Sequence, residues 1–404
     1  MEASTVDGEE RVKPLELFFD LVFVFGITQV TSLLSADPTW GGLLRGMLVL
    51  GALWWAWAAY AWLTNTLNPE EGAVRIAVFA AMGAMLIVAL AVPEAFDDHG
   101  VLFGVAYLVV RAMHIALYAL AAKGDHDLLG AVLRMVPSST ISGVLIITAG
   151  FLEGDVRIAL WVAGLAIDYL GVLVGRGSGW RVSPGHFAER HGLIVIIAIG
   201  ESIVAVGVGA AGLPLGTGVI TAALLGMVVA AALWWTYFDL ASIVTERMLS
   251  RVTGATRAAL ARDVYSYLHM PMVAGIVLFA LAMKKTLENF DDPLKTVPAV
   301  GLCGGLALYL LAHVLLRVRT TGTIGSHLSL VQRVGRGRPL AVLALIALFP
   351  VALEVPALAT LASVTAVFVV LIAYEAIRYR ESRAQIRAGV EPTEEVMSRA
   401  RAES

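Results

Sequence analysis

The sequence predicts an all-α integral membrane protein of about twelve transmembrane helices, arranged as two six-helix repeats in the same orientation. Hydrophobic residues make up 58% of the 404 positions and charged residues only 15%. A soluble domain of this length needs a more charged surface. Long apolar stretches recur along the chain, and short motifs of its first half return in its second half. The lipid bilayer is therefore the expected partner of most of the surface.

Twelve stretches are apolar enough to enter a bilayer and, at roughly 18–25 residues, long enough to cross its hydrocarbon core as helices. In chain order they are 17–35, 41–64, 74–93, 101–122, 128–150, 157–176, 191–211, 216–240, 263–283, 297–316, 339–358 and 360–378. We expect the first repeat to occupy residues 1–180 and the second 181–380, followed by a cytoplasmic tail at 381–404.

Repeated motifs support the duplication. The second stretch carries LWWAW from Leu53, and the eighth carries LWWTY from Leu233, 180 residues later. FGITQV in the first stretch is similar to IGESIV in the seventh, and His114 in the fourth has a counterpart in His313 of the tenth. Because six is even, both copies enter the membrane in the same sense, an arrangement common in transport proteins.

The distribution of basic residues predicts the orientation. If the amino terminus is cytoplasmic, the cytoplasmic loops and tails hold 23 of the 29 Lys and Arg. The positive-inside rule therefore places both termini in the cytoplasm. The polar, partly acidic amino terminus differs from the basic n-region of a cleaved signal peptide, so the first stretch is expected to remain as an anchor.

Several protein classes are excluded by missing features. No basic patch is interleaved with aromatic residues, so we expect no nucleic-acid partner. The single cysteine, Cys303, cannot form a disulfide framework or a CxxC metal site within the chain. No GxxxxGK[ST] motif is present, so a gradient rather than ATP would supply energy. The sequence also lacks HExxH, GxSxG and a lysine in mid-span. We expect no bound cofactor.

Carboxylates inside apolar stretches are the main functional candidates, because a charge at a helix centre costs about 2.5–3.5 kcal/mol on insertion scales. Glu201, followed by Ser202, lies about ten residues into the seventh stretch, which is roughly 15 Å deep and near the midplane. Glu201 is expected to bind an ion or a proton. The alternative is a structural carboxylate that receives a hydrogen bond from Ser or Thr of a neighbouring helix.

Glu16 and Asp20 stand four residues apart at the cytoplasmic mouth of the first stretch, so they share one helix face. Glu16 either binds an ion or stabilises the helix N-terminus. Asp20 lies one turn deeper, which favours a functional role. Thr28 and Gln29 lie near the membrane middle on the same helix and either line the binding site or make interhelical hydrogen bonds.

The seventh stretch opens with Glu189, Arg190 and His191 on the cytoplasmic side. Arg190 either anchors the helix at the interface or pairs with Asp20 or Glu16 across two helices. Such a pair would form a charged gate that opens when a carboxylate is protonated. Asp239, at the cytoplasmic end of the eighth stretch, could join this cluster.

Two further groups of polar residues lie in the apolar stretches. His269, in the ninth stretch, could relay protons near neutral pH or form a hydrogen bond with a neighbouring helix. Pro271, two residues later, frees a backbone carbonyl. Arg111 and His114 of the fourth stretch and Asp168 of the sixth are expected to satisfy one another structurally.

Four blocks resemble a known family. They are LELFFDLVFVFGITQV from Leu15, HFAERHGLIVIIAIGESIVAVGVG from His186, LWWTYFDL from Leu233 and SYLHMPMVAGIVL from Ser266. In this order they are similar to the signatures of the low temperature requirement A (LtrA) family. The resemblance implies a bacterial protein of the inner (plasma) membrane, linked by name to growth in the cold, with no settled biochemical activity.

A fainter resemblance concerns FFDLVFVFGIT from Phe18. It is similar to the first-helix signature, Phe-Ser-Asp followed by an apolar run, of a lysosomal and bacterial potassium-channel family built from six-helix repeats. Phe19 replaces the serine here, and the seventh stretch has no Phe-Ser-Asp. Potassium selectivity is therefore not implied.

These observations favour ion- or proton-coupled transport or ion conduction, acting on a small ion or small molecule, with Glu201 and Asp20 as the coupling carboxylates. No catalytic residue is assigned. An alternative is an intramembrane enzyme for a lipid or isoprenoid substrate, using Glu201 with His191 or His269. A third interpretation is a sensor or scaffold for growth in the cold. The sequence leaves the oligomeric state open, including a homo-oligomer.

Overall fold

The computed structural model describes residues 11–174, 179–321 and 336–388. Within these residues every regular element is helical, apart from an isolated bridge between Pro293 and Pro356. The chain forms two compact units. Unit 1 comprises Met1–Gly26, Ala52–Ile194 and Leu249–Ala261, and unit 2 comprises Ile27–Gly51, Val195–Met248 and Arg262–Ser404. The helices α1 (Pro14–Ala36), α2 (Trp40–Thr64) and α7 (Pro184–Ala210) each contribute residues to both units.

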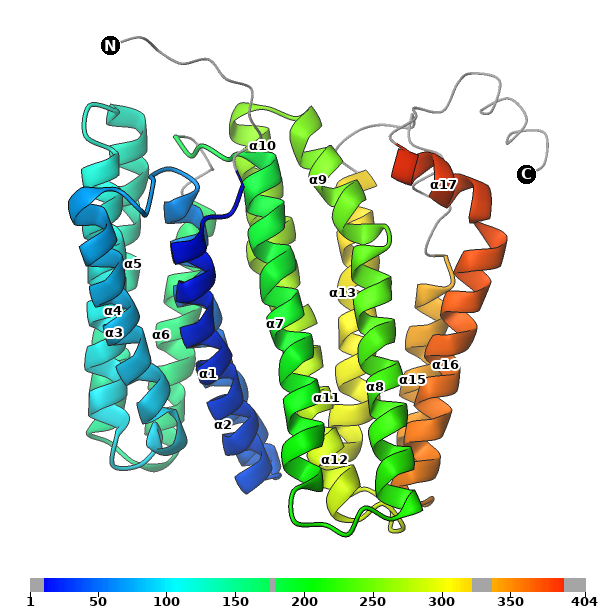
Figure 1. Cartoon of the computed structure of the whole chain (residues 1–404). Coiled ribbons are helices and arrows are strands. Elements are labelled where there is room, and N and C mark those ends of the chain that lie inside the picture. The colour runs from blue at the N-terminus through cyan, green and yellow to red at the C-terminus, as the bar shows by residue number, and fades with distance from the viewer. Residues whose placement is uncertain (1–10, 175–178, 322–335, 389–404) are drawn as a thin grey trace. The chain divides into compact units, whose positions relative to one another are not determined.

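Unit 1 also contains four long helices that pack in chain order (Figure 1). They are α3 (Gly72–Ala91), α4 (Gly100–Ala121), α5 (His126–Gly150) and α6 (Gly154–Val174). Glycines bring α4 and α5 close together, since a Cβ built on Gly150 would lie 2.5 Å from the backbone nitrogen of Val101. Small residues allow such close packing where lipid provides no hydrophobic driving force between helices. The short helix α10 (Gly254–Ala261) completes the unit.

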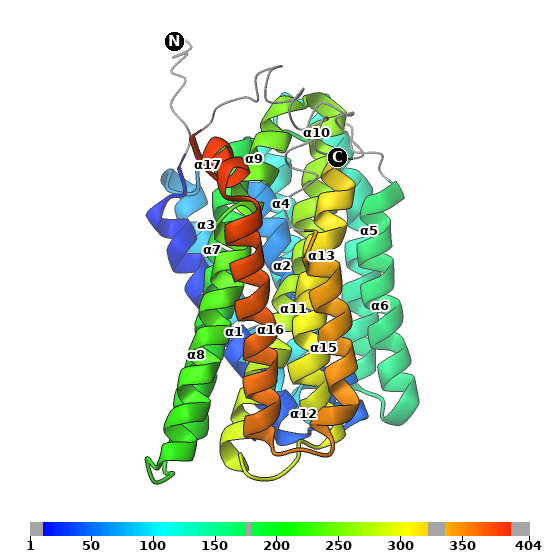
Figure 2. The ribbon, with the colours of Figure 1, turned by 90° about the vertical axis from the view of Figure 1, so that its right-hand side faces the viewer.

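Unit 2 contains most of the helices of the second half of the chain (Figure 2). They are α8 (Thr217–Phe238), α9 (Ala241–Arg251, shared with unit 1), α11 (His269–Glu288), α12 (Thr296–Ala299), α13 (Gly305–Thr321), α15 (Arg338–Ala352), α16 (Ala357–Arg378) and α17 (Arg380–Ala388). Two π-helical segments, Arg262–Leu268 and Val300–Gly304, precede α11 and α13. The packing of α11 on α13 requires Gly275, where a Cβ would lie 2.4 Å from the carbonyl oxygen of Gly305.

The all-helical class is confirmed. Among the described residues, eleven helical segments are long and apolar enough to cross a membrane, and the apolar helix α15 is shorter. These twelve segments overlap the twelve predicted stretches. The stretch predicted at 339–358 is cut short because α15 ends at Ala352, before the bridge at Pro356. The arrangement as two repeats with boundaries at 180 and 380 stays a prediction. Of the predicted tail, residues 389–404 lie outside the described part.

One helix boundary was predicted wrongly in a way that matters. The seventh stretch was predicted to begin at His191, but α7 begins at Pro184. Proline is tolerated in the first turn because its missing N–H has no partner there. Glu189, Arg190 and His191 therefore lie inside the helix rather than at its opening, and Arg190 and His191 are completely buried.

The two ends of α16 provide a test of topology. Its first residue bonds to the Asp292 carbonyl, so the exposed Lys295 lies near its amino end, whereas Arg380 follows its carboxyl end. Twenty-two helical residues separate these ends by about 33 Å. In a chain whose buried Cys303 is replaced by alanine, we expect an impermeant maleimide to label Lys295→Cys from outside the cell and Arg380→Cys only after permeabilisation. Labelling of both from one side would contradict a membrane-spanning α16.

Candidate functional site

Four buried side chains of unit 1 form a cluster of charged groups between α1 and α7. Glu16 and Asp20 are one turn apart on α1, and His186 and Arg190 are one turn apart on α7. Arg190 Nη2 lies 3.0 Å from Asp20 Oδ1, and His186 Nε2 lies 2.9 Å from Glu16 Oε2. Each of the four is at most 3% exposed. The matching spacing on both helices therefore produces two polar contacts, and we call this set the α1–α7 charge cluster.

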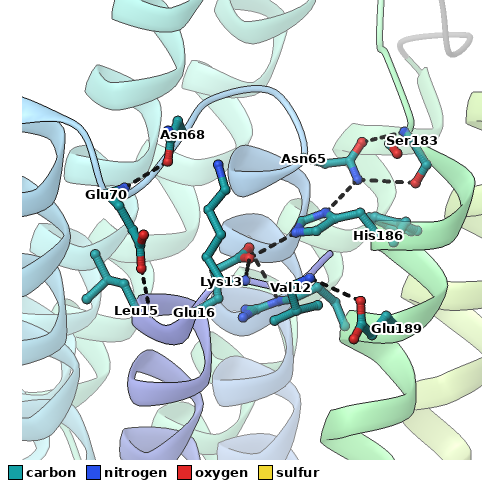
Figure 3. Close-up of polar contacts among 12 residues, drawn as sticks. Val12, Lys13, Leu15, Glu16, Asn65, Asn68, Glu70, Ser183, His186 and Glu189 are labelled. Carbon is teal, nitrogen blue, oxygen red and sulfur yellow. Dashed lines mark hydrogen bonds and ion pairs between the residues drawn. The ribbon is translucent and has the colours of Figure 1, made fainter. Parts of the chain in front are cut away.

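Asn65, which follows the end of α2, orients the ring of His186 through its side-chain amide (Figure 3). The Asn65 Oδ1 accepts a hydrogen bond from the Ser183 N–H at 2.7 Å, which orients the amide. Its Nδ2 then faces His186 Nδ1 at 3.1 Å. An amide NH₂ only donates, so Nδ1 must be the unprotonated nitrogen and Nε2–H donates to Glu16. The geometry thus favours neutral His186.

Trp57 on α2 provides the polar partner that Asp20 lacks within α1. Its Nε1–H donates to Asp20 Oδ1 at 2.9 Å, and the guanidinium carbon of Arg190 lies 5.8 Å from its ring centroid. The ring of His191 meets the Trp57 ring edge-on at 5.0 Å, while His191 Nδ1–H donates to the Phe187 carbonyl at 2.9 Å. His191 therefore packs beside the cluster rather than pairing with its carboxylates through Nδ1.

The charges of the cluster do not balance. Glu16 and Asp20 carry two negative charges, Arg190 carries one positive charge, and His186 is neutral in the tautomer just described. Among the described residues, Glu16 Oε1, Asp20 Oδ2 and Arg190 Nε and Nη1 are buried without a hydrogen-bond partner. Burial of an uncompensated charge is costly. The arrangement can therefore accept one proton or one monovalent cation.

The edge of the cluster contacts the start of α1. Glu189 is exposed and accepts a hydrogen bond from the Val12 N–H at 3.0 Å, so it lies outside the buried group (Figure 3). Glu16 Oε2 also accepts from the Lys13 N–H at 2.8 Å. Glu16 thus stabilises the helix N-terminus and lies in the charge cluster at the same time. Ion binding by Glu16 stays a prediction.

Glu201 lies in unit 2, where Thr28 donates to its Oε2 at 2.5 Å. The side chain is 2% exposed, and Oε1 has no hydrogen-bond partner among the described residues. Lys284 of α11 interacts with it electrostatically. The neighbouring Ser202 bonds back to the Ile199 carbonyl at 2.6 Å, and Gln29 is half-buried. The predicted hydroxyl partner of Glu201 is thus present, together with a lysine that was not predicted.

Asp239 follows the end of α8 in unit 2. It binds Arg383 at 2.7 Å and also Arg387, both on α17 of unit 2. Burial lowers the pKa of the Arg383 guanidinium, a shift that Glu375 opposes. These partners come from a tail helix to which no chemistry was assigned, and the suggestion that Asp239 joins the α1–α7 charge cluster stays a prediction.

His269 bonds to a neighbouring helix, as one predicted alternative states. Its Nδ1 lies 2.9 Å from the Val264 carbonyl, within the π-helical segment, so Nδ1–H donates and Nε2 accepts from Tyr237 O–H at 2.8 Å. The π-helical turn is a geometry frequently found at functional sites. The structure thereby defines the tautomer of His269 without deciding between relay and support.

Arg111 and Asp168 form a balanced pair in unit 1. Arg111 Nη2 lies 3.0 Å from Asp168 Oδ1, and Ser139 bonds to both partners. Arg111 and Asp168 are at most 1% exposed. His114 stays outside the pair and packs its ring on Tyr118 and Tyr60. The predicted mutual satisfaction is confirmed for two of the three residues.

Removing one partner of the Arg111–Asp168 pair should lower the stability of the fold much more than removing both partners. Arg111→Met leaves the buried Asp168 charge without its partner, so we expect a loss of about 3–5 kcal/mol. Arg111→Met combined with Asp168→Leu removes both charges and should recover most of that loss. The midpoint of denaturation in SDS, followed by tryptophan fluorescence, measures both. A double variant less stable than the single variant would contradict this balance.

Sequence reasoning missed His186, Asn65, Trp57 and Lys284 as site residues. His186 and Arg190 repeat the four-residue spacing of Glu16 and Asp20, and this signal in HFAER could have identified His186. Asn65 and Trp57 gave no such signal, since their roles depend on where α2 packs. Among the described residues, no group of three or more His, Cys, Asp and Glu side chains is placed to hold a metal ion.

Comparisons with known proteins identify relatives but no activity. The family model described as bacterial low temperature requirement A protein (LtrA) matches residues 11–373, nearly the whole chain. An uncharacterized protein of Rhizobium meliloti (strain 1021) is 32% identical over 286 residues, which cover 68% of this chain and 69% of the relative. No solved structure matches the chain.

Proposed function

Because the chain belongs to the LtrA family of bacterial multi-pass membrane proteins, we propose that it moves a small ion or small molecule across the inner membrane. In this proposal the α1–α7 charge cluster binds the coupling proton or cation, and both termini lie in the cytoplasm. The function is transport or ion conduction, with Asp20 as the binding carboxylate.

The excess negative charge of the cluster is the observation that carries the proposal. A purely structural group would be expected to balance, as Arg111 and Asp168 do. Here Asp20 Oδ1 already accepts from Arg190 and Trp57, and Oδ2 has no hydrogen-bond partner among the described residues. A proton or small cation at Oδ2 would cancel the excess charge. Intramembrane ionisable residues commonly mark ion pathways for this reason.

Arg190 provides a way to couple binding to movement. Its Nη2 holds Asp20 at 3.0 Å, and its Nε lies 3.9 Å from Glu16 Oε1. Neutralising Asp20 weakens the first contact, so the guanidinium shifts toward Glu16. Two alternative partners one turn apart make Arg190 a two-position element, which is what a charged gate requires.

Glu201 is the second carboxylate of the proposal. The Thr28 hydroxyl satisfies only one of its oxygens, and Lys284 provides a nearby positive charge. In our scheme a cation or proton competes with Lys284 for the Glu201 carboxylate. We further propose that the two halves of the chain arose by duplication, with α2 and α8 as corresponding helices.

Asp20→Asn tests the coupling site. The amide keeps the hydrogen bond from Trp57 but removes the negative charge, so the variant should fold and insert normally. We expect flux in proteoliposomes, measured with a trapped pH dye and imposed proton, sodium and potassium gradients, to fall at least about tenfold, which corresponds to about 1.4 kcal/mol.

Glu189→Gln is the matched control for this test. It removes one negative charge next to Arg190, the partner of Asp20, but the Glu189 side chain is exposed and lies outside the cluster. Its flux should equal that of the parent. If the parent protein moves nothing under any gradient, the enzyme or scaffold interpretation replaces transport; if Asp20→Asn matches the parent, the charge cluster is structural.

Glu201→Gln tests the second carboxylate. Its amide oxygen can still accept the Thr28 hydrogen bond, so we expect normal expression and insertion but loss of ion-dependent flux. Glu201→Lys should also impair assembly, because it places a second cation beside Lys284. Flux from matched amounts of protein measures the first effect, and the yield of folded protein measures the second. Parental flux in Glu201→Gln would leave Glu201 with a structural role.

A further inference from the structure

The helices α15 and α16 pack side by side in unit 2 (Figure 2), and an open apolar groove of ≈ 460 Å³ runs between them. Small side chains line it, including Ala344 of α15 and Ala366 of α16. Leu340 and Val370 also line the groove and are 70% and 67% exposed, so it opens at the surface of the unit. Since α16 is long and apolar enough to cross a membrane, this surface faces lipid.

The groove extends over about half the thickness of a bilayer. Its lining on α16 runs from Ser363 to Tyr374, eleven residues later, which is about 16 Å along a helix. One leaflet contributes about 15 Å to the hydrocarbon core. Tyr374 lies in the last two turns of α16, which ends at Arg378. The groove therefore begins near the membrane surface at the carboxyl end of α16 and has the length of one acyl chain of that leaflet.

Two arginines lie at the mouth of the groove. Gly337 lies against Tyr374, since a Cβ built on it would be 3.0 Å from Tyr374 Cδ1, and Arg336 directly precedes Gly337. Arg378 follows Tyr374 by one helical turn. The hydroxyl of Tyr379 is 3.4 Å from that of Tyr374, and its ring interacts electrostatically with both arginines. Both guanidinium groups thus belong to the end of the groove that Tyr374 marks.

The mouth of the groove is positively charged. Arg336 and Arg378 are exposed, and neither forms an ion pair with another of the described residues. The acidic residue at this end of α16, Glu375, is buried and bonds to Arg338 at 3.1 Å. Tyrosines such as Tyr374 are typical of the level at which lipid headgroups lie. An apolar channel with a cationic mouth at headgroup level is complementary to a negatively charged lipid.

We propose that this groove binds an anionic phospholipid, with one acyl chain between α15 and α16 and the phosphate group at Arg336 and Arg378. The chain covers the small side chains of the groove, and the guanidinium groups donate charge-assisted hydrogen bonds to the phosphate oxygens. Basic residues attract anionic lipids in this way at a membrane surface.

A second copy of this chain fits the groove less well. Small residues also allow helices to pack closely in a membrane. Two copies inserted in the same sense, however, would bring the same ends of α15 and α16 together. Arg336 and Arg378 of one copy would then lie near those of the other, and like charges repel. A lipid phosphate compensates these charges instead.

Native mass spectrometry of the purified full-length chain in detergent tests the site. We expect phosphatidylglycerol to bind at one site per chain, at least about tenfold more tightly than phosphatidylcholine with the same acyl chains, because only the former has a net negative charge. Glycerol 3-phosphate, which has the phosphate but no acyl chain, should not bind detectably. Equal affinities for the two lipids, or equally tight binding of glycerol 3-phosphate, would overturn the proposal.

The headgroup contact is tested by Arg336→Gln combined with Arg378→Gln. Both side chains are exposed, so the double variant should fold, and its affinity for phosphatidylglycerol should fall to that for phosphatidylcholine. Lys295→Gln is the matched control, because it removes an exposed cation near the opposite end of α16 and should leave both affinities unchanged. A double variant that keeps the parental preference would exclude these arginines and overturn the proposal.

The acyl-chain contact is tested by Ala366→Phe, which should fill the groove and weaken both lipids. Val369→Phe is its control, since Val369 is an exposed residue of α16 that does not line the groove. Dimers of the parent that Ala366→Phe abolishes, with lipid affinities unchanged, would assign the groove to a second copy and overturn the proposal. Binding is measured without a gradient, so the result is independent of the transport proposal.

Discussion

The contact on which the candidate site depends is the buried ion pair between Arg190 and Asp20. A guanidinium and a carboxylate this deeply buried persist only if each compensates the desolvation of the other. Trp57 supports that pair by donating to Asp20. Asn65 supports the neighbouring contact, because it orients His186 toward Glu16. The packing of α1 and α2 against the first turns of α7 is specified by these polar contacts as much as by apolar surface.

Three buried arginine pairs of this chain differ in a way that separates support from function. Arg111 with Asp168 and Arg338 with Glu375 each balance one positive charge against one negative charge. The α1–α7 charge cluster sets two carboxylates against one guanidinium, with a histidine held neutral. Burying charge is costly in all three places. The two balanced pairs cross-link their helices, whereas the α1–α7 charge cluster keeps one negative charge without a compensating positive charge.

Charge also explains the position of the last described helix. α17 carries Arg383 and Arg387, and both reach Asp239 at the end of α8. Arg383 also lies over the ring of Trp235, 5.6 Å from its centroid. A segment that looks like a solvated charged tail is thereby fixed to unit 2, where Ile386 lines a small cavity.

The sequence by itself determined the helical class and the approximate spans, because apolar length is a local property of a helix. It indicated the pairing of Arg190 with Asp20 or Glu16 only as one of two alternatives. It also indicated a hydroxyl partner for Glu201. Only the tertiary structure decided that α7 begins at Pro184, that Asp239 binds α17, and that Asn65 contacts His186. These outcomes depend on contacts between residues far apart in the chain, because the packing of the helices decides which partner a buried polar group can reach.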